Sequence, residues 1–194
     1  MPKNRAIFID RDGTVCEEMG YINHLSRFRI FPWAAEAIRK INESGFKAIL
    51  ITNQAGVARG FFPESFVHET HKVLEEHLRK EGAYLDALYY CPHHPQGEPP
   101  YREDCRCRKP KTGMIERAVR ERNLDLSRGY FIGDQSIDLQ LALHANITGI
   151  LVKTGFGLGE LEHRLSKNDP LQPMSVSENL LEAVVTFLRF DYQS

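Results

Sequence analysis

The sequence of 194 residues predicts a doubly wound α/β fold, in which helices cover both faces of a parallel sheet. Short apolar runs recur along the chain, and segments of helix length with helical spacing of apolar residues separate them. Internal repeats, low-complexity tracts and long linkers are all missing from the sequence. We therefore expect a single domain over residues 1–194.

The apolar runs and periodic segments give the order of the elements. Buried strands are expected at 6–10, 46–52, 85–90, 130–132 and 147–152. Helices are expected at 34–44, 63–81, 113–123 and 137–144, with Gly45 and Gly82 as the stops of the first two. A last helix at about 177–190 carries no motif and is expected to pack on the sheet. The stretches 92–110 and 153–173 look irregular.

Charge and composition favour a small ligand over a large acidic partner. The chain has 25 Lys and Arg against 26 Asp and Glu, a net charge of -1, which gives no support for binding nucleic acid or acidic membranes. No apolar run approaches the roughly 18 residues that a membrane helix needs, and residues 1–5 lead directly into the first strand without a secretory signal. We expect a cytoplasmic protein, with a monomer as the working expectation.

Two carboxylates follow the first predicted strand. Asp10 and Asp12 lie two residues apart in the turn Asp10-Arg11-Asp12-Gly13-Thr14. Because ligands bind outside the carboxyl ends of parallel strands, this turn is a candidate site. Asp10 suits a nucleophile that attacks phosphorus, and Asp12 suits the acid and base that serves the leaving group and the water. The alternative is a polar turn with two solvated side chains.

Polar residues at the ends of later strands match the same chemistry. Thr52 can hold phosphoryl oxygens, and Arg108 and Lys109 supply cations for a substrate oxygen and for the transferred group. Asp134 and Asp138 lie four residues apart at a helix start, where carboxylates suit Mg²⁺. Taken singly, each feature has an ordinary explanation, such as strand propensity, a solvated basic pair or a helix cap.

Three of the four cysteines cluster in the irregular stretch that follows the third predicted strand. Cys91, His93, Cys105 and Cys107 supply three sulfurs and one imidazole, which is a complete tetrahedral set for a structural Zn²⁺. Zinc would fold the loop 91–107 and orient the basic pair that follows it. His94 is the competing imidazole. Cys16 stands apart and is expected to be a buried or half-buried thiol, whereas His68 and His71 are expected to form an exposed pair on a helix.

With these residues in place, the chain resembles the haloacid dehalogenase superfamily over about residues 6 to 155. The resemblance implies a Rossmann-like, capless phosphatase with a zinc-binding loop. It assigns Asp10 as nucleophile and Mg²⁺ ligand, and Asp12 as general acid and base that also binds the metal through its backbone carbonyl. It assigns phosphoryl contacts to Thr52 and Lys109 and the last metal position to Asp134, with Asp138 behind the metal ligands.

The cysteine loop is similar to that of a branch whose members act on heptose bisphosphate or on histidinol phosphate. Residues 94 to 104 separate His93 from Cys105, which is close to the longer loop of the heptose type. This resemblance favours a sugar bisphosphate substrate. The alternative is histidinol phosphate or another small phosphomonoester, and the remote alternative is a non-catalytic, zinc-stabilised binding protein. Gln135 stands where some members carry lysine. The expected substrate contacts are Glu18, Met19, Gly20, Tyr21, Thr52, Asn53, Gln54, Ala55, Arg108, Lys109 and Gln135.

Overall fold

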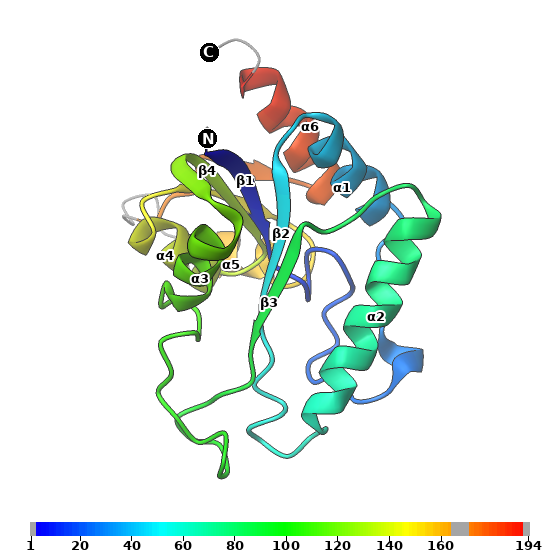
Figure 1. Cartoon of the computed structure of the whole chain (residues 1–194), viewed down its shortest axis with the longest axis vertical. Helices are drawn as coiled ribbons and strands as arrows, with labels where there is room; N and C mark the ends of the chain where they lie inside the picture. Colours follow the sequence, from blue (N-terminus) through cyan, green and yellow to red (C-terminus); the bar gives the residue numbers. More distant parts are fainter. Residues whose placement is uncertain (1–2, 164–170, 192–194) are drawn as a thin grey trace.

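The computed structural model describes residues 3–163 and 171–191, which form a parallel sheet between two layers of helices (Figure 1). The sheet has six strands in the order β3-β2-β1-β4-β5-β6. Its strands are β1 (Asn4–Ile9), β2 (Lys47–Asn53), β3 (Ala87–Cys91), β4 (Leu124–Gly133), β5 (Thr148–Val152) and β6 (Ser175–Ser177). The helices are α1 (Ala34–Glu43), α2 (Glu64–Lys80), α3 (Gly113–Arg122), α4 (Ser136–His144), α5 (Gly157–His163) and α6 (Leu180–Asp191), with a 3-10 turn at Leu25–Arg27.

Alternating side chains of the central strand β1 enter two separate cores. Ile7 and Ile9 pack into the core under α1, α2 and α6, whereas Ala6 and Phe8 pack into the core under α3 and α4. Figure 1 shows these two groups of helices on opposite sides of the sheet. A strand buried on both faces needs apolar residues at every position, which is why the run Ala6 to Ile9 is continuously apolar. The predicted fold class is confirmed.

The order of the strands places the functional end of the sheet. The chain builds β1, β2 and β3 toward one edge and then returns to add β4 on the other side of β1. Such a reversal opens a crevice at the carboxyl ends of the two central strands. Asp10 follows β1 and Asp134 follows β4, so the crevice lies between these two residues.

Some elements differ from the expected ones. β4 begins at Leu124, well before the predicted 130–132, because its first residues pair with Asn4 and Arg5 before the register shifts. α5 lies in the stretch 153–173 that was expected to be irregular, and β6 lies just after that stretch. α6 begins at Leu180, later than the expected 177, because Ser177 ends β6. Residues 164–170 of that stretch lie outside the described residues. None of the described helices combines the length and apolarity needed to cross a bilayer.

Candidate active site

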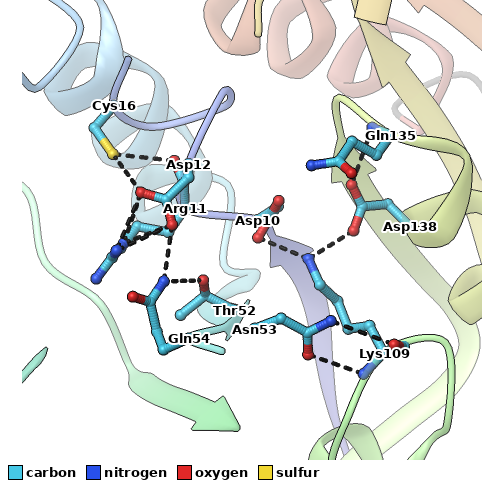
Figure 2. Close-up of polar contacts among 10 residues, drawn as sticks. All are labelled: Asp10, Arg11, Asp12, Cys16, Thr52, Asn53, Gln54, Lys109, Gln135 and Asp138. Atoms are coloured by element: carbon cyan, nitrogen blue, oxygen red, sulfur yellow. Dashed lines mark hydrogen bonds and ion pairs between the residues drawn. The ribbon is translucent and has the colours of Figure 1, made fainter. Parts of the chain in front are cut away.

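Asp10 lies at the centre of the site, directly after β1. Its backbone N–H donates to the Ile132 carbonyl of β4 at 2.9 Å, which fixes its place between the two strands. Lys109 Nζ lies 2.7 Å from Asp10 Oδ1 and 2.7 Å from Asp138 Oδ1, and all three side chains are buried (Figure 2). Burial raises the pKa of Asp10, despite the nearby lysine. Burial by itself lowers the pKa of Lys109, but the two carboxylates outweigh it and hold the group charged.

A third buried carboxylate, Asp134, completes a cluster that suits a divalent cation. Carboxylate oxygens of Asp10, Asp134 and Asp138 all lie within 4.8 Å of one another. Asp134 Oδ2 accepts the Phe156 backbone N–H at 2.8 Å, but its buried Oδ1 has no hydrogen-bond partner among residues 3–163 and 171–191. Burial and the two neighbouring carboxylates raise the pKa of Asp134. Three carboxylates face one ammonium group here, so a hard cation such as Mg²⁺ fits the donor set.

Glycine is required beside this cluster because the chain passes very close to Asp134. A Cβ atom at Gly13 or at Gly155 would lie 2.1 Å from Asp134 Oδ2, and both residues have positive φ, at 81° and 58°. The Thr154 hydroxyl donates to the Gly13 carbonyl at 2.6 Å and joins the two loops. The glycine of the Asp-x-Asp-Gly-Thr turn therefore leaves room for the carboxylate that follows β4.

Asp12 points away from Lys109 and is held by different partners (Figure 2). The buried Arg11 guanidinium contacts both Asp12 oxygens at 3.0 to 3.2 Å, and Gln54 Nε2 donates to Asp12 Oδ2 at 2.8 Å. Arg11 Nη1 also lies 3.2 Å from Thr70 Oγ1 and 3.2 Å from His71 Nε2, both on α2. Helix α2 thus fixes the guanidinium that orients Asp12.

The end of β2 supplies three polar side chains with distinct contacts. Thr52 is buried, and its hydroxyl accepts from Gln54 Nε2 at 2.9 Å. Asn53 binds the backbone of Lys109 on both sides: its Oδ1 accepts the Lys109 N–H at 3.0 Å, and its Nδ2 donates to the Lys109 carbonyl at 3.3 Å. This pair of hydrogen bonds holds the loop that carries the buried lysine against the end of β2.

These residues surround a pocket of about 300 Å³ at the carboxyl end of the sheet. Twelve predicted site residues contribute to its wall: Asp10, Asp12, Glu18, Gly20, Tyr21, Thr52, Asn53, Gln54, Ala55, Arg108, Lys109 and Gln135. Met19 does not contribute to this wall: its side chain packs against the core, and its carbonyl accepts from Arg27 at 2.9 Å, so its contact with substrate stays a prediction. The sequence reasoning missed Arg11, Ile22, Gly56, Phe62, Ile137 and Phe156. Of these, only Arg11 had a signal, its place inside the two-aspartate turn.

Two of the predicted site residues, Gln135 and Asp138, lie at the start of α4. Gln135 precedes the helix, and its backbone N–H donates to Asp138 Oδ2 at 3.1 Å. Asp138 therefore accepts from this N–H with one oxygen and from Lys109 with the other. Asp138 connects the helix start to the lysine, and Gln135 lines the pocket.

The structure brings the four expected zinc ligands together. One ligand atom from each of Cys91, His93, Cys105 and Cys107 lies within 4.8 Å of the others. Cys107 Sγ lies 2.7 Å from Cys91 Sγ and 3.5 Å from His93 Nδ1, so the cluster joins the end of β3 to the end of the loop. This donor set of three sulfurs and one imidazole fits Zn²⁺.

The remaining histidines and Cys16 lie outside this cluster. His94 Nε2 contacts Arg59 at 3.1 Å. His68 is exposed as expected, but the expectation of an exposed His71 is wrong, because that ring is buried against Arg11 and burial lowers its pKa to about 3. Cys16 is a buried thiol as expected. Its Sγ lies 3.4 Å from Asp12 Oδ1.

Comparisons with known proteins agree with this geometry. A family model described as HAD-hydrolase-like matches residues 106–183, and one described as polynucleotide kinase 3 phosphatase matches residues 6–144. A D-glycero-D-manno-heptose-1,7-bisphosphate 7-phosphatase from Thermosynechococcus vestitus is 41% identical over 184 residues, covering 92% of this chain and 93% of its own. The chain belongs to the haloacid dehalogenase-like family of hydrolases.

Other members of the family are similar over most of the chain. A D-glycero-beta-D-manno-heptose-1,7-bisphosphate 7-phosphatase from Yersinia pestis is 43% identical over 152 residues, 77% of this chain and 81% of its own. The crystal structure of D,D-heptose 1,7-bisphosphate phosphatase from B. bronchiseptica, complexed with magnesium and phosphate, superposes with a TM-score of 0.83 at 29% identity. It covers 96% of this chain and 99% of its own. The predicted resemblance is confirmed.

Proposed function

We propose that the protein is a phosphatase that removes the C7 phosphate of D-glycero-D-manno-heptose 1,7-bisphosphate. The observation that carries the proposal is the buried Asp10, paired with Lys109 at 2.7 Å beside an Asp134 oxygen that has no hydrogen-bond partner in the part of the chain that the structure describes. Relatives named for this reaction, which are about 40% identical, support the choice of substrate. The product would feed the synthesis of heptose precursors for lipopolysaccharide, in the cytoplasm, and we expect a monomer.

In the first half of the reaction, an Asp10 oxygen attacks phosphorus and forms an aspartyl phosphate, while the bond to the C7 oxygen breaks. Lys109 neutralises charge on the transferred group, because its ammonium already lies against the nucleophile. The Thr52 hydroxyl, which accepts from Gln54 Nε2, donates its own proton to a phosphoryl oxygen. Asp12 gives a proton to the leaving alkoxide.

In the second half, Asp12 takes a proton from water as the water attacks the aspartyl phosphate. The bond between phosphorus and the Asp10 oxygen breaks, and inorganic phosphate leaves. Arg11 keeps Asp12 at the pocket wall through contacts to both of its oxygens. Both halves use one carboxylate as the nucleophile and the other as the proton carrier.

Asp10, Asp134 and the Asp12 carbonyl are the proposed holders of Mg²⁺, which when bound offsets the repulsion between a carboxylate and an anionic phosphate. The unpartnered Asp134 oxygen and the excess of buried negative charge support this assignment. Zn²⁺ in the cysteine cluster has a structural role, since four protein ligands leave no open position. Arg108 and Lys109 directly follow the last cysteine, and both line the pocket.

A kinetic comparison tests the substrate. We expect kcat/KM for the heptose bisphosphate, offered as both anomers, to exceed that for histidinol phosphate by about tenfold or more, because a charge-assisted contact from Arg108 favours a second anionic group and disfavours an amine. Arg108→Ala should narrow the ratio. Arg106→Ala is the matched control, since Arg106 lies on the same loop but pairs with Glu116. Equal kcat/KM values for the two substrates would refute the proposed choice of substrate. No phosphate release from either would refute the proposed phosphatase activity.

A further inference from the structure

Two arginines have no carboxylate partner among the described residues: Arg108 in the pocket wall, and Arg59 over the ring of the wall residue Tyr21. Arg108 lines the pocket, and its Nη1 donates only to the His93 carbonyl, at 3.4 Å. Arg59, on the loop after β2, is exposed and is not joined to any carboxylate by an ion pair within the described ranges. Glu98 lies beside Gly60 without pairing with Arg59. In contrast, two other basic side chains of the loop between β3 and α3 form ion pairs, Arg106 with Glu116 and Lys111 with Asp104.

The contact between Arg59 and His94 places two donors face to face. The Gln96 backbone N–H donates to His94 Nδ1 at 3.0 Å, so Nδ1 bears a lone pair and Nε2 bears the proton. Arg59 Nη2 lies 3.1 Å from this same Nε2. A guanidinium N–H and an imidazole N–H that converge in this way need a shared acceptor, and an anion with several oxygens supplies one.

Tyr21 connects this pair to the pocket. The Arg59 guanidinium lies over the Tyr21 ring, 5.8 Å from its centroid, and Tyr21 lines the pocket with Arg108. Phe61 stacks on the same ring, with the two ring centroids 4.3 Å apart. The loops from β2 and from the cysteine cluster thus converge at one rim.

We propose that Arg59, His94 and Arg108 form an anion subsite that binds the distal phosphate of the substrate, the one that is not hydrolysed. The inference rests on the proposed function and adds Arg59 and His94 as residues that determine specificity. The cysteine cluster supports the subsite from below, because His94 directly follows the ligand His93 and Arg108 directly follows Cys107. A phosphate bound here anchors the sugar while the other phosphate reaches Asp10.

The test compares Arg59→Ala with the parent on two substrates that share the reacting phosphate, heptose 1,7-bisphosphate and heptose 7-phosphate. We expect kcat/KM for the bisphosphate to fall about tenfold more than for the monophosphate, with most of the change in KM. Arg106→Ala, whose side chain is 85% exposed and paired with Glu116, should change neither value. Equal losses on both substrates, or no loss on either, would overturn the subsite.

Binding separates this inference from the proposed function. Calorimetry in the presence of Mg²⁺ measures the two affinities. Arg59→Ala should weaken the binding of heptose 1-phosphate about tenfold and leave the affinity for inorganic phosphate unchanged, because inorganic phosphate binds at Asp10. This readout needs no turnover. If the parent protein hydrolysed neither substrate, the proposed function would fail while the binding ratio still decided the subsite. An Arg59→Ala variant that bound both ligands as the parent does would refute the subsite alone.

Discussion

At the scale of single residues, charge explains the arrangement of the pocket floor. Asp10, Asp134 and Asp138 bring three buried carboxylates toward one ammonium group, and this arrangement costs free energy unless a cation joins it. Asp12 lies outside this cluster, and its carboxylate pairs with the Arg11 guanidinium instead. Two carboxylates that are two residues apart in sequence therefore lie in different surroundings, as their different proposed roles require.

Asp10→Asn tests the nucleophile. An amide is not a competent nucleophile at phosphorus and binds Mg²⁺ weakly, so we expect phosphate release to fall by more than about a thousandfold. The melting temperature should stay close to that of the parent, because the amide has nearly the same shape. Asp104→Asn, at an exposed residue paired with Lys111, is the control. Activity of Asp10→Asn within about tenfold of the parent would show that Asp10 is not the nucleophile.

At the scale of elements, several contacts hold the loop between β3 and α3, and two of these attachments lie next to the basic pair. The cysteine cluster closes one, and the Asn53 side chain binds the Lys109 backbone at the other. The loop itself has little regular structure, so its order depends on these contacts. Loss of zinc should therefore affect the position of the basic pair more than the sheet.

Cys105→Ser tests this coupling. We expect the purified parent to hold about one zinc per chain and the variant to hold much less, because a hydroxyl is a poor ligand for Zn²⁺. Activity should fall with the zinc content, since Lys109 loses its support. Cys16→Ser is the matched control, because Cys16 is the one cysteine outside the cluster. Metal analysis that found no zinc in the parent, purified without chelator, would contradict the assignment.

At the scale of the whole molecule, the buried carboxylates link folding to pH and to Mg²⁺. Burial raises the pKa of Asp134 above its ordinary value of 3.8, so the folded chain binds more protons than the unfolded chain above that pH. In metal-free protein this contribution to the free energy of unfolding is therefore present at low pH and is lost as pH rises through the folded pKa. Mg²⁺ binds the deprotonated carboxylates, so the stabilisation of the fold by Mg²⁺ grows as pH rises.

We expect Mg²⁺ to raise the melting temperature of metal-stripped protein more at about pH 8 than at about pH 5. At a concentration about 100 times the dissociation constant, the gain is about 2.7 kcal/mol, which corresponds to about 5 to 10 °C for a chain of this length. Asp134→Asn should remove most of the gain at the higher pH. A gain that is equal at both pH values, or unchanged in Asp134→Asn, would place the magnesium elsewhere.

The sequence by itself determined the fold class and most of the pocket. Apolar runs and helical periodicity report burial that is local to each element, and parallel strands bring their carboxyl ends to one edge, so Asp10, Thr52 and Asp134 could be placed together in advance. The spacing of the cysteines and His93 likewise predicted one cluster. A single domain over the whole chain stays a prediction.

Only the tertiary structure decided which partners the polar side chains take. Arg11 and His71 are 60 residues apart, and no pattern within α2 shows that this histidine faces the Asp12 turn rather than solvent. Met19 looked like a wall residue by its place in the sequence, but it packs on the core. β6 is too short for periodicity to be visible. Such features depend on packing between segments distant along the chain, whereas sequence patterns record only the burial and spacing within each segment.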